Sequence, residues 1–265
     1  MPRRLFSCFG RASTTISHSR ATSDESLEGI REGAVVVELF SSQGCATSPE
    51  AELVVSRLGR GDFNLDFPVF VLAFHVDYWD HMGWKDPYGS SQWTVRQKAY
   101  VEALRVDTLY TPQVVVQGRS QCVGNEEEGM LGLIMDAPRF PSPSFQATFQ
   151  RTSQDSLQVS LTGASKSKID NQGVNIMVAL YESGLVTDCL KGENKGRVLS
   201  NDYVVRRLEK MCFVKDISAR KAISGTINFS LWEGFNLAKS GIVVFVQNSA
   251  HHIFGAQRLE LPANL

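Results

Sequence analysis

The chain has 265 residues, of which 43% are hydrophobic and 21% charged, and its formal net charge is −1. This composition is typical of a globular protein with a real apolar core, and the lack of a basic excess argues against nucleic acid as a partner. No apolar run approaches the roughly 20 residues that a membrane-spanning helix needs, so no transmembrane segment is expected.

The first 29 residues predict a flexible tail that is basic and rich in Ser, Thr and Arg. No acidic residue precedes Asp24. The composition resembles an organellar transit peptide, with a plain disordered tail as the alternative. The cysteines are odd in number and form no Cys-x-x-Cys pair, which is typical of a reducing compartment; they are Cys8, Cys45, Cys122, Cys189 and Cys212. We therefore expect a cytoplasmic protein, with the mitochondrion or chloroplast as the alternative.

Alternating strand and helix patterns predict an α/β domain over residues 30–137. Residues 33–40 form an apolar run typical of a buried strand. Ser48 is expected to be the N-cap of a helix, Pro49 its first residue, and Gly59 to Gly61 its end. The later segments are strands at 67–74, 114–116 and 120–123 and helices at 93–104 and 126–135.

Three prolines near residue 140 mark a boundary, after which the apolar pattern changes to period two. The alternation predicts an antiparallel, sandwich-like all-β domain over residues 140–265. Its basic segment 191–210 is expected to be a solvated loop with a short helix at Tyr203 to Lys210, or to lie against the first domain and narrow its site. His251 and His252 are expected in a turn.

The Gly44-Cys45 pair follows the first strand and precedes the first helix. A thiol at a helix N-terminus meets unpaired N–H groups and the positive end of the helix dipole, which lower its pKa. Gly44 would let the turn fold tightly and let a substrate come close. The alternative is an inert, packed cysteine.

Thr111 and Pro112 stand directly before the 114–116 strand. Thioredoxin-like folds place a cis proline at this point, facing the cysteine turn, where the preceding residue offers backbone hydrogen bonds to a substrate. An ordinary trans proline at a strand start is the alternative.

The segment from His75 to Asp86 follows the end of the second strand, where α/β sheets often place their sites. His75 could act as a base or raise the thiolate fraction of Cys45. Trp79 and Trp84 could line a groove for a peptide or a small thiol. A metal site on the His and Asp side chains and a purely structural loop are the other two interpretations.

Several motifs together resemble the DUF1223 family, whose members are thioredoxin-like proteins of bacteria and plants. The motifs lie at 40–45 (FSSQGC), 74–80 (FHVDYWD), 83–87 (GWKDP), 110–113 (YTPQ), 192–197 and 202–206. The resemblance implies a thioredoxin-like fold followed by a β domain. Many members carry Cys-x-x-Cys where this chain has Cys45 and Ser48.

Two functions are compatible with this sequence. The first is a thiol oxidoreductase or thiol-transfer protein with a monothiol Cys-x-x-Ser site, in which Cys45 is the nucleophile. Glutathione would be a possible co-substrate, a disulfide-bearing client protein the other possible partner, and no further cofactor is expected. The second is a non-catalytic binding or adaptor protein, in which Ser48 only caps the helix.

Overall fold

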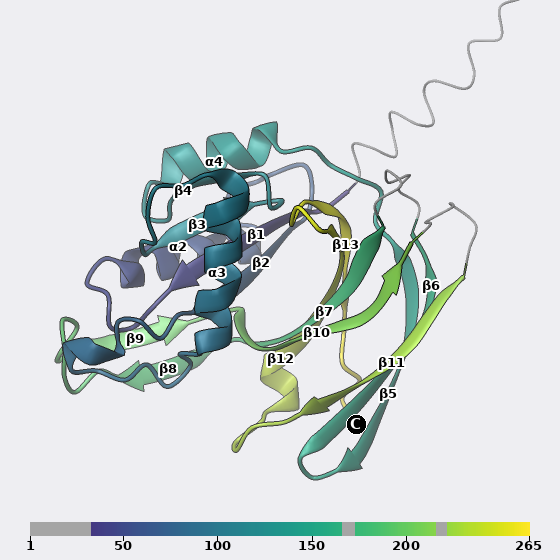
Figure 1. Ribbon diagram of the computed structural model, residues 1–265. Coiled ribbons are helices and arrows are strands. Elements are labelled where there is room, and N and C mark those ends of the chain that lie inside the picture. The colour runs from purple at the N-terminus through teal and green to yellow at the C-terminus, as the bar shows by residue number, and fades with distance from the viewer. Residues whose placement is uncertain (1–32, 166–172, 216–221) are drawn as a thin grey trace, which may run out of the picture.

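The computed structural model describes residues 33–165, 173–215 and 222–265. The predicted tail at 1–29, with Cys8 and any targeting role, lies outside these residues. The described part is a mixed α/β protein with one large mixed sheet and two smaller antiparallel sheets (Figure 1). None of its helices is long and apolar enough to cross a membrane.

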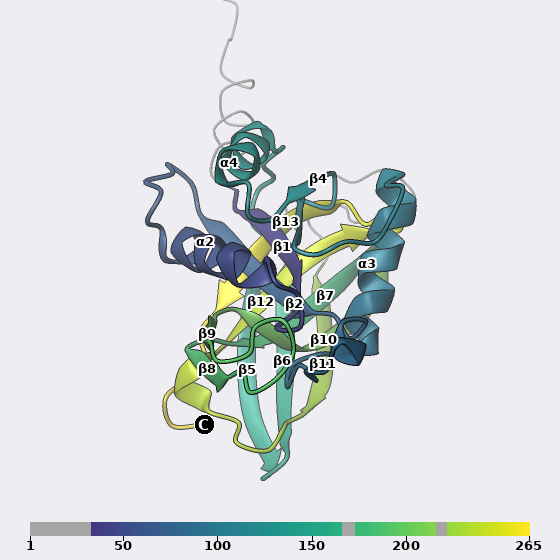
Figure 2. The ribbon, with the colours of Figure 1, turned by 90° about the vertical axis from the view of Figure 1, so that its left-hand side faces the viewer.

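Strands and helices alternate in the first half of the described chain, in the order that the sequence predicts. The elements are β1 (Val35–Ser41), α2 (Ser48–Arg60), β2 (Val69–His75), the 3-10 turn η1 (Asp80–Met82), α3 (Ser91–Leu104), β3 (Gln113–Val116), β4 (Ser120–Val123) and α4 (Glu127–Asp136). Figure 2 shows α3 on one face of the sheet and α2 and α4 on the other. Because both faces are covered, every residue of β1 is buried, which explains its near-continuous apolar sequence.

The pairing of β1 with β2 and β3 brings the ends of three strands together at one end of the sheet. β1 runs parallel to β2, with Ser41 opposite His75, and antiparallel to β3, with Phe40 opposite Gln113. The residues after Ser41, after His75 and before Gln113 therefore meet. They are the cysteine turn, the His75–Asp86 segment and the Thr111-Pro112 pair.

In the described residues between 144 and 259, the regular elements are strands and one short 3-10 turn, in agreement with the all-β prediction for this half. The elements are β5 (Ser144–Ser153), β6 (Ser156–Ala164), β7 (Val174–Glu182), β8 (Leu185–Asp188), β9 (Val198–Asn201), β10 (Val204–Val214), β11 (Ile223–Ser230), η2 (Leu237–Lys239), β12 (Ser240–Asn248) and β13 (Ile253–Leu259). The sheet β11-β6-β5 shares an apolar core with β7 and β12. In this core, Phe229 of β11 and Leu157 of β6 belong to the same cluster as Ile176 of β7 and Val244 of β12.

One eight-stranded sheet, in the order β13-β12-β7-β10-β2-β1-β3-β4, runs through both halves. Val204 of β10 pairs in parallel with Ala73 of β2. The core around β1 also includes Ala179 and Phe245 from the second half. The predicted boundary near 137–140 falls between α4 and β5, and the division into two domains stays a prediction.

The predicted short helix at Tyr203 to Lys210 is wrong, because residues 204–210 belong to strand β10. β10 pairs with β7 along its length, and the register shifts between Val205 and Arg207 and again between Lys210 and Cys212. Each bulge inserts one residue and breaks the period-two alternation that would have indicated a strand. His251 and His252 do lie in the turn between β12 and β13, as predicted.

Candidate functional site

The cysteine turn connects the end of β1 to the start of α2. Its backbone is closed by hydrogen bonds from Cys45 N to Ser42 O (3.1 Å) and from Gly44 N to Ser42 Oγ (3.1 Å). A Cβ atom on Gly44 would lie 2.9 Å from the Cβ of Trp79. The neighbour that requires glycine at this position is therefore Trp79.

The Cys45 thiol faces the loop before β3. Its Sγ lies 3.5 Å from the backbone oxygen of Thr111 and 3.5 Å from Thr47 Oγ1. The Thr111–Pro112 peptide bond is cis, the geometry expected for a thioredoxin-like fold at this point. Cys45 is only 3% exposed. The structure thus brings Cys45, Thr111 and Pro112 together, with the thiol under cover.

Neighbouring hydroxyl groups shift the titration of Cys45. Burial disfavours the charged thiolate, but hydrogen bonds with the side chains of Ser48, Thr111 and Thr47 outweigh that penalty and lower the pKa of the thiol. Trp79 Nε1 donates to Thr111 Oγ1 at 2.7 Å, which leaves the hydroxyl hydrogen of Thr111 available to the sulfur.

The other three cysteines of the described chain titrate in the opposite direction. Burial, with the nearby Glu126 carboxylate, raises the pKa of Cys122 to about 11. Burial also raises the pKa of Cys189 and of Cys212. All four described cysteines are free thiols, so Cys189 and Cys212 form no disulfide. Cys45 alone among them has a lowered pKa.

Ser48 is the first residue of α2, not its N-cap as predicted. Thr47 occupies the N-cap position without a side-chain capping bond, and Pro49 follows as the second helical residue. The Ser48 hydroxyl instead accepts a hydrogen bond from Ser42 N at 3.3 Å. The helix thus begins one residue earlier than predicted, and the Ser48 side chain holds the cysteine turn instead of capping the helix.

His75 is fully buried between two carboxylates. Its Nδ1 lies 2.7 Å from Asp86 Oδ2 and its Nε2 lies 3.2 Å from Glu52 Oε1. Burial opposes the imidazolium, but the charges of Asp86 and Glu52 prevail and raise the pKa of His75 to about 10. Both ring nitrogens face acids rather than Cys45. The structure therefore does not bring His75 to the thiol as a base, and its contacts are those of a positioning residue.

Asp86 connects the buried His75 ion pairs to the cysteine turn. Its carboxylate accepts hydrogen bonds from Gln43 N (2.7 Å), His75 Nδ1 and Tyr88 N (2.9 Å). Burial is overcome by the His75 charge and these hydrogen bonds, which lower the pKa of Asp86. An anchored carboxylate at Gln43 N fixes the backbone one residue before Gly44.

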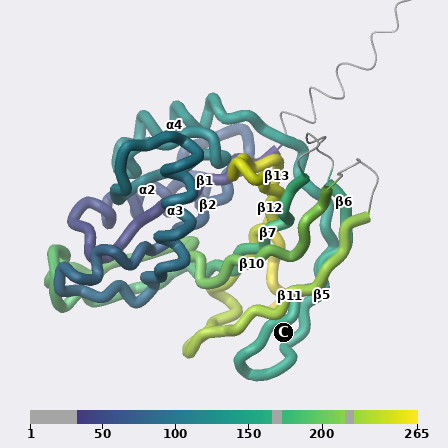
Figure 3. Tube along the Cα trace, viewed as in Figure 1, coloured from purple at the N-terminus to yellow at the C-terminus, as the bar shows by residue number. Residues whose placement is uncertain are grey.

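The loop between β8 and β9 covers the turn from the other side. Asn194 Nδ2 donates to Gln43 O and to Cys45 O, both at 2.9 Å. Gln43 Nε2 donates to Asn201 Oδ1 at 2.8 Å. Figure 3 shows the β8–β9 segment beside the loop that follows β2, where Tyr88 and Thr187 are hydrogen-bonded. The expectation that the basic segment after residue 191 lies against the first half is confirmed by these contacts of Asn194 and Asn201 and by the pairing of Val204 with Ala73.

Trp79 and Trp84, which were predicted to line a groove, are half-buried, and the indole N–H group of each is used in a hydrogen bond within the protein. Trp79 Nε1 donates to Thr111, and Trp84 Nε1 donates to Gln43 Oε1 at 3.1 Å. Within the described residues, no group of three or more His, Cys, Asp or Glu side chains is arranged to hold a metal ion.

Sequence reasoning missed Gln43, Glu52 and Asn194. One signal was available for Glu52: it is the middle member of a polar stripe with Ser48 and Ser56, spaced four residues apart on an otherwise apolar helix face. All three side chains are buried. Nothing local distinguishes Asn194, because its contacts lie about 150 residues away in the sequence.

The comparisons with known proteins identify the family of the chain. The DUF1223 family, described as "Protein of unknown function", matches residues 36–247, and the chain belongs to this family. No curated protein sequence matches the chain.

Two solved structures are similar over most of the chain. Protein AGR_C_4864 from Agrobacterium tumefaciens is 25% identical, with a TM-score of 0.60 over 86% of this chain and 95% of that one. HBP35 of Porphyromonas gingivalis is 15% identical, with a TM-score of 0.60 over 87% of this chain and 76% of that one. At that identity the second likeness shows the fold alone.

Proposed function

We propose that this member of the DUF1223 family is a thiol oxidoreductase or thiol-transfer protein with a single nucleophilic cysteine, Cys45. The observation that carries the proposal is the setting of the Cys45 sulfur. It lies beside the Thr111-Pro112 pair, and neighbouring hydroxyl groups lower the pKa of its thiol. A lowered pKa raises the fraction of thiolate, which is the nucleophilic form.

The proposed scaffold is a thioredoxin-like domain at residues 30–137, followed by a sandwich-like β domain. Support comes from the strand order β2-β1-β3-β4, with β1 and β2 parallel and β3 and β4 antiparallel to their neighbours. The helices α2 and α3 follow β1 and β2, as thioredoxin-like chains require. In this scaffold Cys45 stands where the first cysteine of a Cys-x-x-Cys pair would stand.

The proposed reaction is a thiol–disulfide exchange that needs one protein sulfur. The Cys45 thiolate attacks a sulfur of a mixed disulfide, forms a disulfide with it and expels the other sulfur as a thiolate. A low-molecular-weight thiol, glutathione in the simplest case, then attacks this new disulfide and regenerates the Cys45 thiolate. Ser48 has no sulfur with which to close an internal disulfide, and the pKa of about 11 disfavours Cys122 as the resolving thiol.

The test measures the pH dependence of alkylation at each cysteine by mass spectrometry of peptides from the intact protein. Cys45 should be alkylated with a midpoint below that of a free cysteine, while Cys122 serves as the internal control with a high midpoint. Exchange with the mixed disulfide of glutathione and 2-mercaptoethanol should then be catalysed by the wild type and lost in Cys45→Ser. A folded Cys45→Ser variant with unchanged exchange would exclude the proposal.

A second candidate, a non-catalytic binding or adaptor protein, is favoured by the 3% exposure of Cys45. A substrate disulfide has to reach the sulfur, and the loop carrying Asn194 is hydrogen-bonded across the turn. If Cys45 is slow to react at every pH while the fold is intact, this second function becomes the better account. Binding partners should then be retained equally by wild type and Cys45→Ser.

A further inference from the structure

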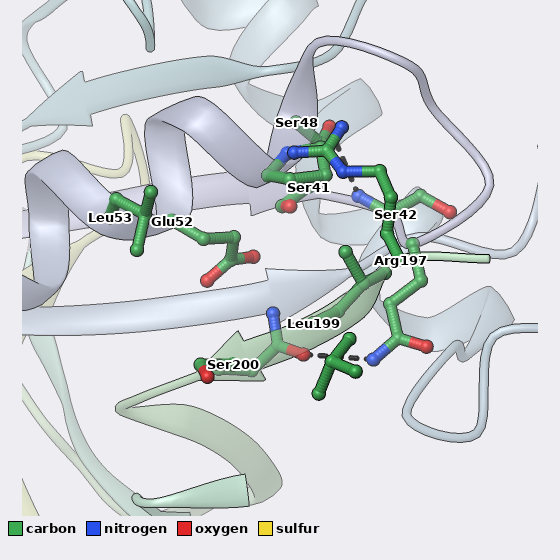
Figure 4. Close-up of a pocket in the computed structure, with 12 residues that line it drawn as sticks. Ser41, Ser42, Ser48, Glu52, Leu53, Arg197, Leu199 and Ser200 are labelled. Carbon is green, nitrogen blue, oxygen red and sulfur yellow. Dashed lines mark hydrogen bonds between the residues drawn. The ribbon is translucent and has the colours of Figure 1, made fainter. Parts of the chain in front are cut away.

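A small polar pocket lies beside the cysteine turn, between the first half of α2 and strand β9 (Figure 4). Its volume is about 90 Å³, which is enough for a small organic ion and too little for a drug-sized ligand. Ser42, Ser48 and Glu52 form part of one wall, and Arg197, Ser200 and Asn201 part of the other. Cys45 does not line it.

Glu52 gives this pocket an unsatisfied buried acceptor. The residue is 3% exposed, and neither carboxylate oxygen accepts a hydrogen bond from any described residue. His75 Nε2 is 3.2 Å from Oε1, but the two atoms are not aligned for a hydrogen bond. A buried carboxylate without donors is costly, which indicates that something else completes its shell.

The charges around Glu52 specify what is missing. One imidazolium, His75, faces two carboxylates, Glu52 and Asp86. Asp86 is already satisfied by the backbone N–H groups of Gln43 and Tyr88. The surplus negative charge and the open acceptor sites therefore belong to Glu52. A ligand that carries both a positive charge and N–H donors, namely an ammonium group, supplies what this site lacks.

The opposite wall offers a positive charge. Arg197 donates to Asn194 Oδ1 through Nη1 at 2.9 Å, which uses one of its five N–H groups. Figure 4 shows its side chain extending back toward Ser48 and Ser41, while Glu52 occupies the part of the pocket farther along α2. The Ser41 hydroxyl has no hydrogen-bond partner among the described residues. The pocket thus has a cationic side near the helix start and an anionic side deeper along the helix.

We propose that this pocket binds a small zwitterion, a free α-amino acid, with its ammonium group on Glu52 and its carboxylate toward Arg197 and the serine hydroxyls. The inference does not depend on the chemistry of Cys45. It assigns the protein a ligand-binding site separate from the thiol, with Ser42 and Ser48 as residues common to the pocket wall and the cysteine turn.

The test titrates the full chain with three matched probes and follows the heat of binding and backbone NMR shifts. Glycine carries both charges, methylamine only the ammonium and acetate only the carboxylate. Glycine should bind at least tenfold more tightly than either fragment, and shifts should centre on α2 and β9. Absence of glycine binding at millimolar concentration, leaving water alone in the pocket, would overturn the proposal, as would equal binding of methylamine.

Variants locate the site and separate it from the thiol. Arg197→Ala, at an exposed position, should weaken glycine binding about tenfold or more, whereas its exposed neighbour Lys195→Ala should leave it unchanged. Glu52→Gln should abolish binding if circular dichroism shows it folded; if it does not fold, Arg197→Ala carries the test. Cys45→Ser should bind glycine like the wild type, so loss of thiol activity and loss of this site remain distinguishable. Wild-type affinity in Arg197→Ala would contradict the assignment.

Discussion

The side-chain amide of Asn194 donates a hydrogen bond to the backbone oxygen of Cys45 at 2.9 Å. The same amide nitrogen donates to Gln43 O, so one residue of the β8–β9 loop holds both sides of Gly44. This contact joins the second half of the chain to the turn that carries the candidate nucleophile. It fixes the turn, and we expect the same loop to restrict access to the thiol; the two effects can be measured separately.

Asn194→Ala should make the Cys45 thiol more accessible to reagents and should lower the stability of the fold. Loss of two hydrogen bonds that leave carbonyl oxygens unpaired should lower the free energy of unfolding by about 1–3 kcal/mol. Cys45 should be alkylated faster than in the wild type, because its cover is no longer held. Denaturant unfolding and alkylation rates check both effects. Lys195→Ala is the control, and equal Cys45 rates in both variants would show that Asn194 does not restrict access.

Ser48→Ala should raise the pKa of Cys45, because it removes a hydroxyl hydrogen bond that lowers it. The alkylation midpoint should move to higher pH, and the rate at neutral pH should fall. Loss of the bond from Ser42 N should also cost about 0.5–1.5 kcal/mol of stability. Ser200→Ala, an exposed serine on β9, is the control. An unmoved midpoint in folded Ser48→Ala would contradict the role given to this hydroxyl.

His75 should make stability depend on pH on the alkaline side. Its pKa is raised from about 6.5 to about 10 in the folded protein, so its stabilising ion pairs are fully present below pH 6.5. That contribution, a few kcal/mol in scale, should be lost as the pH rises toward 10. Unfolding free energies at pH 6, 8 and 10 should fall in the wild type.

A His75→Gln variant provides the comparison for this pH dependence. It should be less stable at pH 6 and should show a flatter decline to pH 10, since no imidazolium is present to lose its proton. Asp86 adds an acid-side effect: its pKa is lowered, so its contribution is present at neutral pH and is lost as the pH falls through the acidic range. Parallel alkaline declines in both proteins would contradict the ion-pair assignment.

Gly44→Ala should destabilise the protein, because a Cβ atom would lie 2.9 Å from the Cβ of Trp79. The expected loss is about 1–3 kcal/mol, the usual range for an overpacked position. Gly132→Ala is the matched control, since it lies within α4 with no atom near its added Cβ. That control should gain about 0.5–1 kcal/mol from helix propensity. Thermal unfolding of the two variants should therefore shift in opposite directions.

The sequence by itself determined the local elements around the thiol. The apolar run of β1 and the Pro49 helix start follow from short-range periodicity and backbone chemistry. Together with the strand at 114–116, they predict the end of the sheet at which Cys45 and Pro112 meet. These features depend on residues that are close together in the sequence, so the sequence pattern alone is enough to predict them.

Only the tertiary structure decided which polar residues surround the turn. Glu52, His75 and Asp86 come from three segments, and sheet pairing rather than any local pattern brings them together. One interpretation of the sequence gave His75 a role as a base or as an aid to the Cys45 thiolate, whereas in the structure both of its ring nitrogens face carboxylates, which raise its pKa. Buried charges select partners by distance and dielectric environment, which a linear pattern does not specify.

The second half shows the same division. Period-two alternation predicted most of its strands. The bulges in β10 interrupt this alternation, so that strand was not predicted. Its pairing with β2 joins residues far apart in the sequence. The cover provided by Asn194 likewise depends on where the β8–β9 loop comes to rest. Local periodicity fixes what each segment becomes, whereas packing between distant segments decides what each side chain can touch.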